Sequence, residues 1–146
     1  MGMFDSINIS SSGLTAEKTR IDIISKNIAN AEVTRAAGGM PYRRQMAVFQ
    51  EKKSSPFSEF LNDASRKFVN SGVKISSIVE DETPFKLVYE PGHPDADENG
   101  YVKMPNVDLV KEMVDMISAS RSYEANIASI NASKSMLMKA LDIGRR

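Results

Sequence analysis

Four residues near the centre of the chain could bind a divalent cation. Asp95, Asp97, Asn99 and Gly100 follow the spacing D-x-D-x-N-G, which opens an EF-hand calcium loop. The last position of such a loop would be Asn106, where calcium requires the two carboxylate oxygens of a glutamate. No helical pattern clearly precedes the segment. A tight Asn-Gly turn between two strands is therefore the favoured interpretation, and the sequence predicts no metal site.

The single histidine, His93, is the other candidate for chemistry. It could act as a general base beside Asp95 or Asp97, but it stands between Gly92 and Pro94, which is typical of a turn. The chain contains no cysteine and no second histidine that could join it at a metal ion. The sequence also offers no paired nucleophile and no glycine loop for phosphate. We therefore predict no catalytic residue and no cofactor.

Composition excludes several further classes of protein. The 146 residues carry 19 basic and 19 acidic side chains, so no net charge favours nucleic acid or an anionic membrane. No apolar run approaches the roughly 18 residues of a membrane helix. The N-terminus lacks the basic and apolar regions of a cleavable signal peptide. Met1, Gly2 and Ser6 fit the myristoylation pattern, but that pattern is too short to be informative.

One long helix is predicted for residues 105–144. Its apolar positions step by four and then three residues, the 3.5-residue period of a coiled coil, interrupted at Ser120 and Lys134. Asn106 is the expected N-cap and Gly144 the expected stop. The predicted contact positions are Leu109, Met113, Met116, Tyr123, Ile127, Ile130, Leu137 and Leu141. Such a helix would be roughly 55 Å long, too long to bury its stripe in a small globule.

A second helix with the same period is predicted for residues 4–30. Its contact positions are Phe4, Ile7, Leu14, Ile21 and Ile28. Gly13 weakens the helix, so the first turns, around residues 10–13, could be irregular. Because both ends share one period, we expect them to pair as an antiparallel coiled coil. Serine and alanine dominate residues 118–135, so helices of neighbouring subunits could also approach closely and complete the burial.

The residues between the helices are predicted to form a small β-rich module behind a linker. Residues 31–39 read as the linker, and residues 41–49 as an extended segment from which Arg43 and Arg44 face outward or toward a partner. Alternating apolar residues then predict strands at 73–79, 85–90 and 101–104, and a short helix is predicted at 57–68. The fold class is mainly α with a β-rich insertion. Residues 1–30 and 106–146 form the helical domain, and residues 31–105 form the linker and module.

The sequence resembles the bacterial flagellar axial proteins, and among them the proximal rod proteins of the basal body. The resemblance rests on S-K-N-I-A-N-A at 25–31, P-Y-R-R at 41–44, the stretch 93–107, E-M-V-D-M at 112–116 and R-S-Y-E-A-N at 121–126. Glu32-Val33 departs from the Asn-Thr common in that family. The signature residues are Asn27, Asn30, Pro41, Tyr42, Arg43, His93, Pro94, Asp95, Gly100, Tyr101, Pro105, Asn106, Arg121, Tyr123 and Asn126.

This resemblance implies a non-enzymatic structural subunit of the flagellar rod. The terminal helices would form the inner coiled-coil layer of a hollow tube that transmits torque from motor to hook and lines the export channel. The expected partners are other copies of the chain, other proximal and distal rod and axial proteins, and the type III export apparatus. The expected location is the periplasmic rod, reached without a cleavable signal peptide. The alternative is a cytosolic helical adaptor or export chaperone, and an enzyme centred on His93 comes third.

Overall fold

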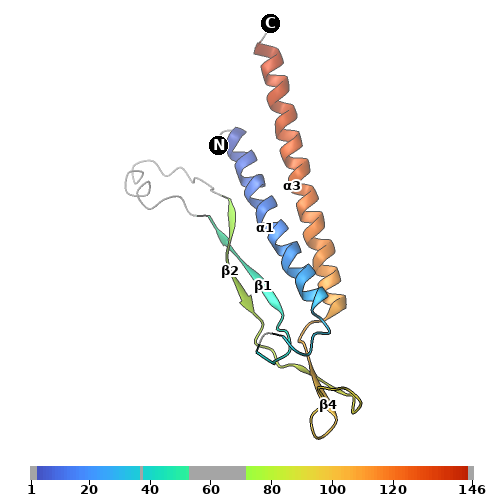
Figure 1. Ribbon diagram of the computed structural model, residues 1–146. Helices are drawn as coiled ribbons and strands as arrows, with labels where there is room; N and C mark the ends of the chain where they lie inside the picture. The colour runs from blue at the N-terminus through green and yellow to red at the C-terminus, as the bar shows by residue number, and fades with distance from the viewer. Residues whose placement is uncertain (1–2, 37, 53–71, 145–146) are drawn as a thin grey trace, which may run out of the picture.

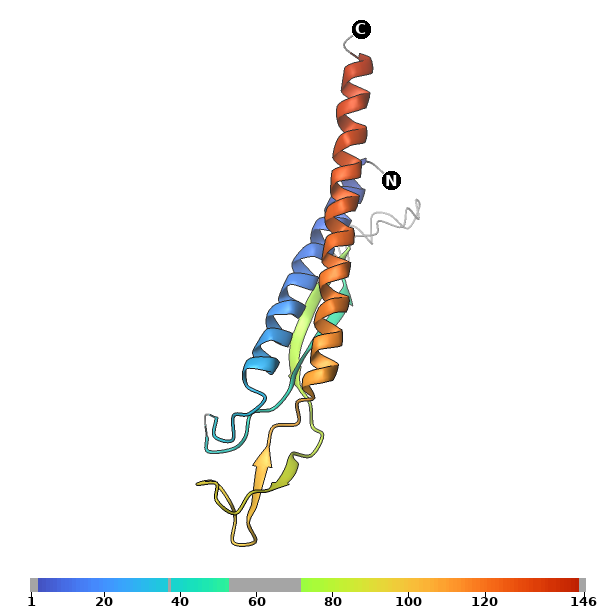
Figure 2. The same ribbon diagram turned by 90° about the vertical axis from the view of Figure 1, so that its right-hand side faces the viewer.

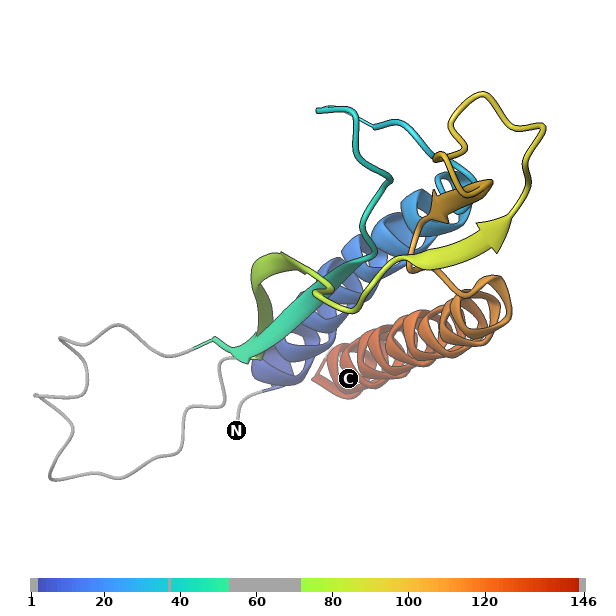
Figure 3. The same ribbon diagram turned by 90° about the horizontal axis from the view of Figure 1, so that it is seen from below.

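The computed structural model describes residues 3–36, 38–52 and 72–144 of the chain. Two long helices, α1 (Met3–Ala29) and α3 (Leu109–Gly144), lie side by side and run in opposite directions (Figure 1). A β-hairpin packs along α1, and a second hairpin lies beyond the base of the helix pair (Figure 2). Seen from below, α1 lies between the first hairpin and α3 (Figure 3). The predicted fold class, two long helices with a small β-rich insertion, is confirmed.

The two helices keep one register over most of their shared length. Ser6 contacts Ser133 at an Oγ–Oγ distance of 3.4 Å, and Ser10 contacts Ser129 at 3.2 Å. Gly13 faces Asn126, because a Cβ atom added at this glycine would lie 3.1 Å from the amide of Asn126. In each pair the two residue numbers add up to 139. Small side chains at these positions let the two backbones approach closely.

The expected irregularity around residues 10–13 is wrong, because α1 continues through Gly13 without a break. The cost of a glycine inside a helix is about 1 kcal/mol. Here Gly13 leaves room for the side chain of Asn126 on the neighbouring helix, and packing of this kind offsets the intrinsic preference.

The beginning of α3 also differs from the prediction. The helix begins at Leu109, and its cap is Asp108 rather than Asn106. The Oδ1 atom of Asp108 accepts hydrogen bonds from the backbone N–H groups of Val110 at 3.0 Å and Lys111 at 3.3 Å. An aspartate in this position satisfies donors that the first helical turn leaves free. The side chain of Asn106 is therefore available for the contacts described below.

The first hairpin consists of β1 (Gln45–Glu51) and β2 (Val73–Glu80), which pair antiparallel. It confirms the predicted extended segment at 41–49 and the strand at 73–79. The hairpin touches α1 where the backbone N–H of Val73 donates to Ser12 Oγ at 3.0 Å. Gly72 has a φ of +87°, and a Cβ atom there would collide with the Ser12 side chain. The glycine thus permits both this backbone conformation and the close approach to α1.

The second hairpin consists of β3 (Lys86–Tyr89) and β4 (Tyr101–Met104), both of which were predicted. Val102 faces inward and is fully buried, whereas Tyr89 and Tyr101 stack edge to face with ring centroids 5.3 Å apart. The connection is the longer loop 90–100 rather than a two-residue Asn-Gly turn. The predicted helix at 57–68 lies outside the described residues.

Few side chains of the described residues are buried within the single chain. The buried apolar residues are Ala16, Ile23, Ile24, Tyr42, Val102, Val107 and Ala119. Many larger apolar side chains are exposed, among them Phe4 at 70% and Met113 at 53%. Within the described residues, none of the helices has the length and apolar character needed to cross a membrane. The described part of the chain thus leaves much apolar surface open to water, which indicates interaction surfaces.

Candidate functional site: a buried polar junction and its surroundings

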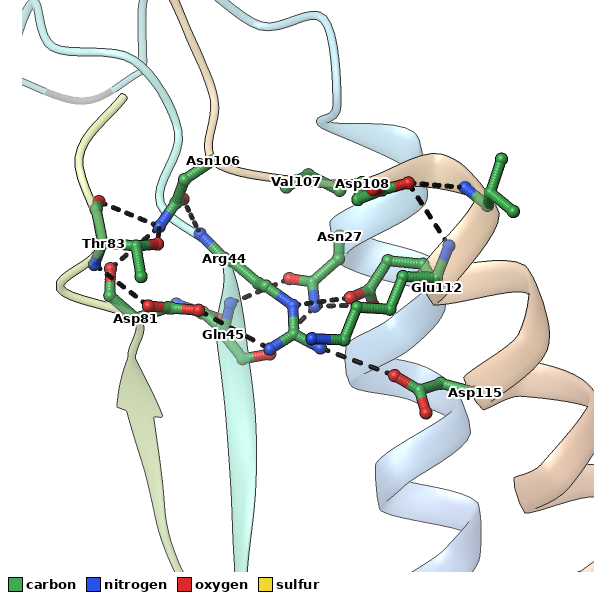
Figure 4. Close-up of polar contacts among 12 residues, drawn as sticks. Asn27, Arg44, Gln45, Asp81, Thr83, Asn106, Val107, Asp108, Glu112 and Asp115 are labelled. Atoms are coloured by element: carbon green, nitrogen blue, oxygen red, sulfur yellow. Dashed lines mark hydrogen bonds and ion pairs between the residues drawn. The ribbon is translucent and has the colours of Figure 1, made fainter. Parts of the chain in front are cut away.

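A cluster of polar side chains joins α1, β1 and α3 at the base of the helix pair (Figure 4). At its centre is Asn27 of α1, whose side chain is 1% exposed. Its Oδ1 accepts hydrogen bonds from the Tyr42 hydroxyl and the Gln45 N–H, both at 2.9 Å. Its Nδ2 donates to the Gln45 carbonyl at 2.9 Å and to Glu112 Oε2 at 3.0 Å. The amide therefore fixes the end of α1 to the start of β1.

Glu112 brings a negative charge into this cluster from α3. Its side chain is fully buried, and Oε1 accepts a hydrogen bond from Arg44 Nε at 2.6 Å. The same guanidinium lies 3.7 Å from an Asp81 carboxylate oxygen and 3.6 Å from one of Asp115. Burial of a charge is costly unless it is paired and hydrogen-bonded. Here Asn27 and Arg44 supply the partners that Glu112 requires.

The side chain of Asn106 holds the connection between β4 and α3 beside Arg44. Its Oδ1 accepts from the Arg44 N–H at 2.9 Å, and its Nδ2 donates to the Asp81 carbonyl at 3.0 Å and to Thr83 Oγ1 at 2.8 Å. Pro105 and Val107, the residues on either side, are buried. The connection from β4 to α3 is thus held by hydrogen bonds and by packing.

The expectation that Arg43 and Arg44 face outward or toward a partner is wrong, because both side chains contact groups of their own chain. The Arg44 side chain is only 13% exposed and pairs with carboxylates of its own chain. The Arg43 guanidinium lies over the ring of Phe85, 4.5 Å from its centroid, and donates to the Asp81 carbonyl at 3.1 Å. Both arginines are used inside the chain because the buried Glu112 and the face of Phe85 offer favourable partners for a cation.

The surroundings in the junction shift the pKa values of two side chains, Tyr42 and Asp81. Burial raises the pKa of the Tyr42 hydroxyl, and the nearby carboxylates of Glu112 and Glu80 raise it further. Hydrogen bonds from the backbone and side chain of Thr83 lower the pKa of Asp81, and Arg44 lowers it further against the effect of burial. The structure therefore favours a neutral Tyr42 and an ionised Asp81.

The residues considered first as metal-binding or catalytic candidates lie in the loop 90–100, which contacts the linker at 31–39. Asp95 accepts hydrogen bonds from Thr34 Oγ1 at 2.8 Å and pairs with Arg35 Nε at 2.7 Å. His93 Nδ1 accepts from the Asp95 N–H at 3.0 Å, as in a turn. Asp97 Oδ1 accepts from the backbone N–H groups of residues 99 and 101. Among the described residues, no group of three or more His, Cys, Asp or Glu side chains could hold a metal ion.

The predicted contact positions lie beside the line where α1 and α3 touch. On α1, Phe4 is exposed, and the other four positions are half-buried: Ile7, Leu14, Ile21 and Ile28. On α3, the half-buried positions are Met116, Tyr123, Ile130 and Leu137. The exposed positions are Leu109, Met113, Ile127 and Leu141, at 38–64%. The buried positions of α3 are Glu112, Ala119 and Ser133, which the sequence analysis did not assign to contact positions.

The remaining signature residues are distributed over the three segments of the junction and the helices. Asn30 caps its own helix by donating to the Lys26 carbonyl at 2.7 Å. Asn126 faces Gly13 and donates to the Ser122 carbonyl, whereas Arg121 is exposed. Pro41 is half-buried, Pro94 is exposed and Gly100 adopts a φ of +79°. The signature segments thus contain Asn27, Tyr42, Arg44, Asn106 and Glu112 of the junction, but not Asp81.

Comparisons with known proteins agree with this architecture. A family model described as "Flagella basal body rod protein" matches residues 7–36, and one described as "Flagellar basal body rod FlgEFG protein C-terminal" matches residues 98–143. The two matched regions contain most of α1 and α3, together with β4.

Close relatives cover nearly the entire length. Flagellar basal-body rod protein FlgC of Borreliella burgdorferi is 51% identical, with 98% of each chain covered. The proteins of the same name from Bacillus subtilis and Salmonella typhimurium are 50% and 45% identical, over 99% of this chain and 100% of theirs. The chain therefore belongs to the FlgC family of flagellar basal-body rod proteins, which are structural subunits of the bacterial flagellum and not enzymes.

Proposed function

We propose that this rod subunit polymerises through one side of its α1–α3 pair, which packs as an antiparallel coiled coil in the inner layer of a hollow shaft. In this proposal residues 1–30 and 106–146 form the assembling layer, and residues 31–105 form an outer linker and β module. The shaft transmits torque from motor to hook and lines the export channel. Membership of the rod family implies assembly with other rod components.

The main support is that the predicted contact positions share one side of the helix pair. Ile7, Leu14, Ile21 and Ile28 are spaced by seven residues, so they line one side of α1. At about 100° per residue this side lies roughly opposite Ser12, which contacts the hairpin. The first hairpin therefore leaves this side of α1 uncovered.

The matching side of α3 follows from the ion pairs. Asp115 is paired with Arg20 at 3.7 Å and with Arg44, which directly precedes β1, at 3.6 Å. Asp115 therefore marks the side of α3 near the first hairpin. Met116 follows Asp115 by one residue, so it lies about 100° around the helix, on the other side of Glu112. The residues on that side are Met116, Tyr123, Ile130 and Leu137, with Met113, Ile127 and Leu141 further out.

The row of contact positions on α1 and the row on α3 therefore lie next to each other on the same side of the helix pair. Together they form one apolar face, which we call the heptad face. A helix from a neighbouring copy laid on this face would bury the side chains that the single chain leaves half exposed. Contacts of this kind join different surfaces on the two copies and do not close, so they generate helical filaments. The heptad face therefore fits a polymer better than a monomer.

The periplasmic location and the recognition by the type III export apparatus are part of this proposal. They rest on the family assignment. The alternative, a cytosolic helical adaptor or export chaperone, is not favoured by the relatives. Such a protein would be absent from purified basal bodies, which is a direct way to separate the two functions.

The experiment that tests assembly is the substitution Ile127→Asp. Ile127 is 38% exposed and lies on the heptad face, so a charge there should abolish swimming while the protein remains present in cells. The matched control is Ala128→Asp, one residue further along α3, which is also exposed but points about 100° away. Normal swimming of Ile127→Asp would contradict the proposal.

A further inference from the structure

The line along which α1 and α3 touch is formed by small polar residues over the half that lies away from the junction. The facing pairs there are Ser6–Ser133, Ser10–Ser129 and Gly13–Asn126. A hydrogen bond between two neutral hydroxyls in a partly exposed position contributes little net free energy. This half of the contact therefore does little to determine which residues of the two helices face each other.

A shift of α3 by four residues along α1 would produce a similar contact. In the observed pairs the two residue numbers add up to 139, and after a shift of α3 away from the base they would add up to 135. The displacement is about 6 Å along the axis, and four residues return the same side of the helix to within about 40°. The facing pairs would become Ser6–Ser129, Ser10–Ala125 and Gly13–Ser122, which again join small residues.

The lengths of the helices do not select one register either. α3 has 36 residues and α1 has 27, and α3 continues beyond the first residue of α1 (Figure 1). Met3 of α1 faces Met136 in the observed register and would face Ala132 after the shift. The first residue of α1 therefore has a facing residue on α3 in both registers.

The base of the helix pair, in contrast, fits only the observed register. The buried Glu112 carboxylate lies 3.0 Å from Asn27 Nδ2 and 2.6 Å from Arg44 Nε. After the shift Glu112 would face Ile23, an apolar side chain that is 6% exposed. A buried carboxylate without its hydrogen-bond partners is strongly destabilising. The junction, rather than the serine contacts, therefore makes the observed register the favoured one.

We propose that Glu112, through Asn27 and Arg44, determines the axial register of α3 on α1, and that a second register one helical turn away becomes populated when this carboxylate is removed. Buried polar residues select one register in the same way in coiled coils. The first hairpin packs on α1 and the second hairpin is joined to α3, so the register also sets the distance between the two hairpins. The inference concerns a single chain and goes beyond the proposed function, because it does not require that copies polymerise.

Cysteine crosslinking within the purified full-length chain tests the register, because the natural chain contains no cysteine. The pair Ser10→Cys with Ser129→Cys reports the observed register, and Ser10→Cys with Ala125→Cys reports the shifted one. Mild oxidation at low protein concentration keeps the disulfide within one chain. In the natural background only the first pair should close readily, because the second pair is about 6 Å further apart along the axis.

The junction variant is Glu112→Leu combined with Arg44→Met. It replaces the ion pair by apolar side chains of similar length, so that no single buried charge is left unpaired. In this background the disulfide yield should shift from the Ser10–Ser129 pair to the Ser10–Ala125 pair. The matched control is Glu124→Leu combined with Arg121→Met, which makes the same two exchanges at exposed positions of α3 and should keep the observed register.

Gly13→Ala provides a second test of the same register. The added Cβ atom would lie 3.1 Å from the Asn126 amide in the observed register, whereas it would meet the smaller Ser122 in the shifted one. In the junction variant this substitution should raise the yield of the shifted pair further, and Asn126→Ala should reverse that increase. In the natural background it should leave the register unchanged, because Glu112 still has its partners.

Circular dichroism establishes whether the junction variant keeps its helices. If the helices are lost, the milder variant Asn27→Leu takes its place, because Arg44 then remains to pair with Glu112. The proposal is overturned if the folded variant closes only the Ser10–Ser129 pair, or if the natural chain closes both pairs equally. It is also overturned if the exposed control shifts as much as the junction variant. All three results leave the heptad face untouched, since failure of the proposed function would appear as normal swimming of Ile127→Asp.

Discussion

The Asn27 amide of α1 donates to the Glu112 carboxylate of α3 at 3.0 Å, and neither side chain is more than 1% exposed. The same asparagine is hydrogen-bonded to both backbone groups of Gln45 at the start of β1. One contact therefore fixes the relative positions of two helices and a strand that are distant in the sequence. The base of the helix pair is the place where the three segments of the chain meet.

Replacement of Glu112 by Gln should destabilise the protein by about 3 kcal/mol, because it leaves the guanidinium of Arg44 without its closest carboxylate in a buried position. Urea unfolding followed by circular dichroism measures this change. Glu124→Gln on the exposed side of α3 is the control and should change the free energy of unfolding by less than about 0.5 kcal/mol. A similarly small effect at Glu112 would mean that the junction contributes little to stability.

Stability should decline in alkaline solution because of Tyr42. Its pKa is raised above the ordinary value of 10.0, mainly by burial and by Glu112. The unfolded chain therefore loses the tyrosine proton at a lower pH than the folded chain, and the free energy of unfolding falls as the pH rises above 10 toward the raised pKa.

Tyr42→Phe should show a smaller decline over the same pH range, although it is less stable at neutral pH because Asn27 loses a hydrogen bond. Tyr89→Phe, at an exposed position, should keep the decline of the natural chain. Urea midpoints measured from pH 8 to pH 11 distinguish these cases. Parallel curves for all three proteins would exclude Tyr42 as the source.

Amide hydrogen exchange in the isolated monomer should be uneven along α1. Its buried side chains lie mainly in the second half, at Ala16, Ile23, Ile24 and Asn27, whereas among residues 4–13 Ser10 alone is buried. Residues 4–13 should therefore exchange faster than residues 16–27, because local opening costs less where few apolar groups are buried. Uniformly strong protection over residues 5–28 would show that the helix is complete without neighbouring copies.

Gly100→Ala should destabilise the second hairpin by about 1–2 kcal/mol. The position has a φ of +79°, which costs roughly that amount for a residue with a Cβ atom. The added atom would also lie 2.9 Å from the Tyr89 ring. Gly92→Ala is the control, since nothing lies within 4 Å of a Cβ atom there and its φ is not positive. Thermal unfolding of the two variants compares them directly, and equal melting temperatures would argue against the strain at Gly100.

The sequence alone allowed the prediction of every helix and strand of the described residues except for their exact ends. Period-3.5 patterns located α1 and α3, and alternating apolar residues located β2, β3 and β4. These patterns suffice because they depend only on which residues are apolar and on their spacing. The signature segments indicated the family, which the relatives then confirmed.

The residues of the junction could not be predicted in the same way. A heptad pattern shows which positions are apolar, but not which neighbour covers them, so the buried positions Glu112, Ala119 and Ser133 were missed. The role of Arg44 depends on carboxylates 37, 68 and 71 residues away along the chain. The N-cap was misassigned to Asn106 because Asn and Asp are similarly favoured there. The Asn106 side chain instead bonds to Arg44, Asp81 and Thr83, and Asp108 caps the helix.

The short connection between β4 and α3 has a mechanical consequence. It consists of Pro105, Asn106, Val107 and Asp108, and two of these are buried while the other two are held by hydrogen bonds. The connection contains no glycine, and the ring of Pro105 fixes one of its backbone angles. A rotation of α3 about its axis should therefore rotate the second hairpin together with the helix.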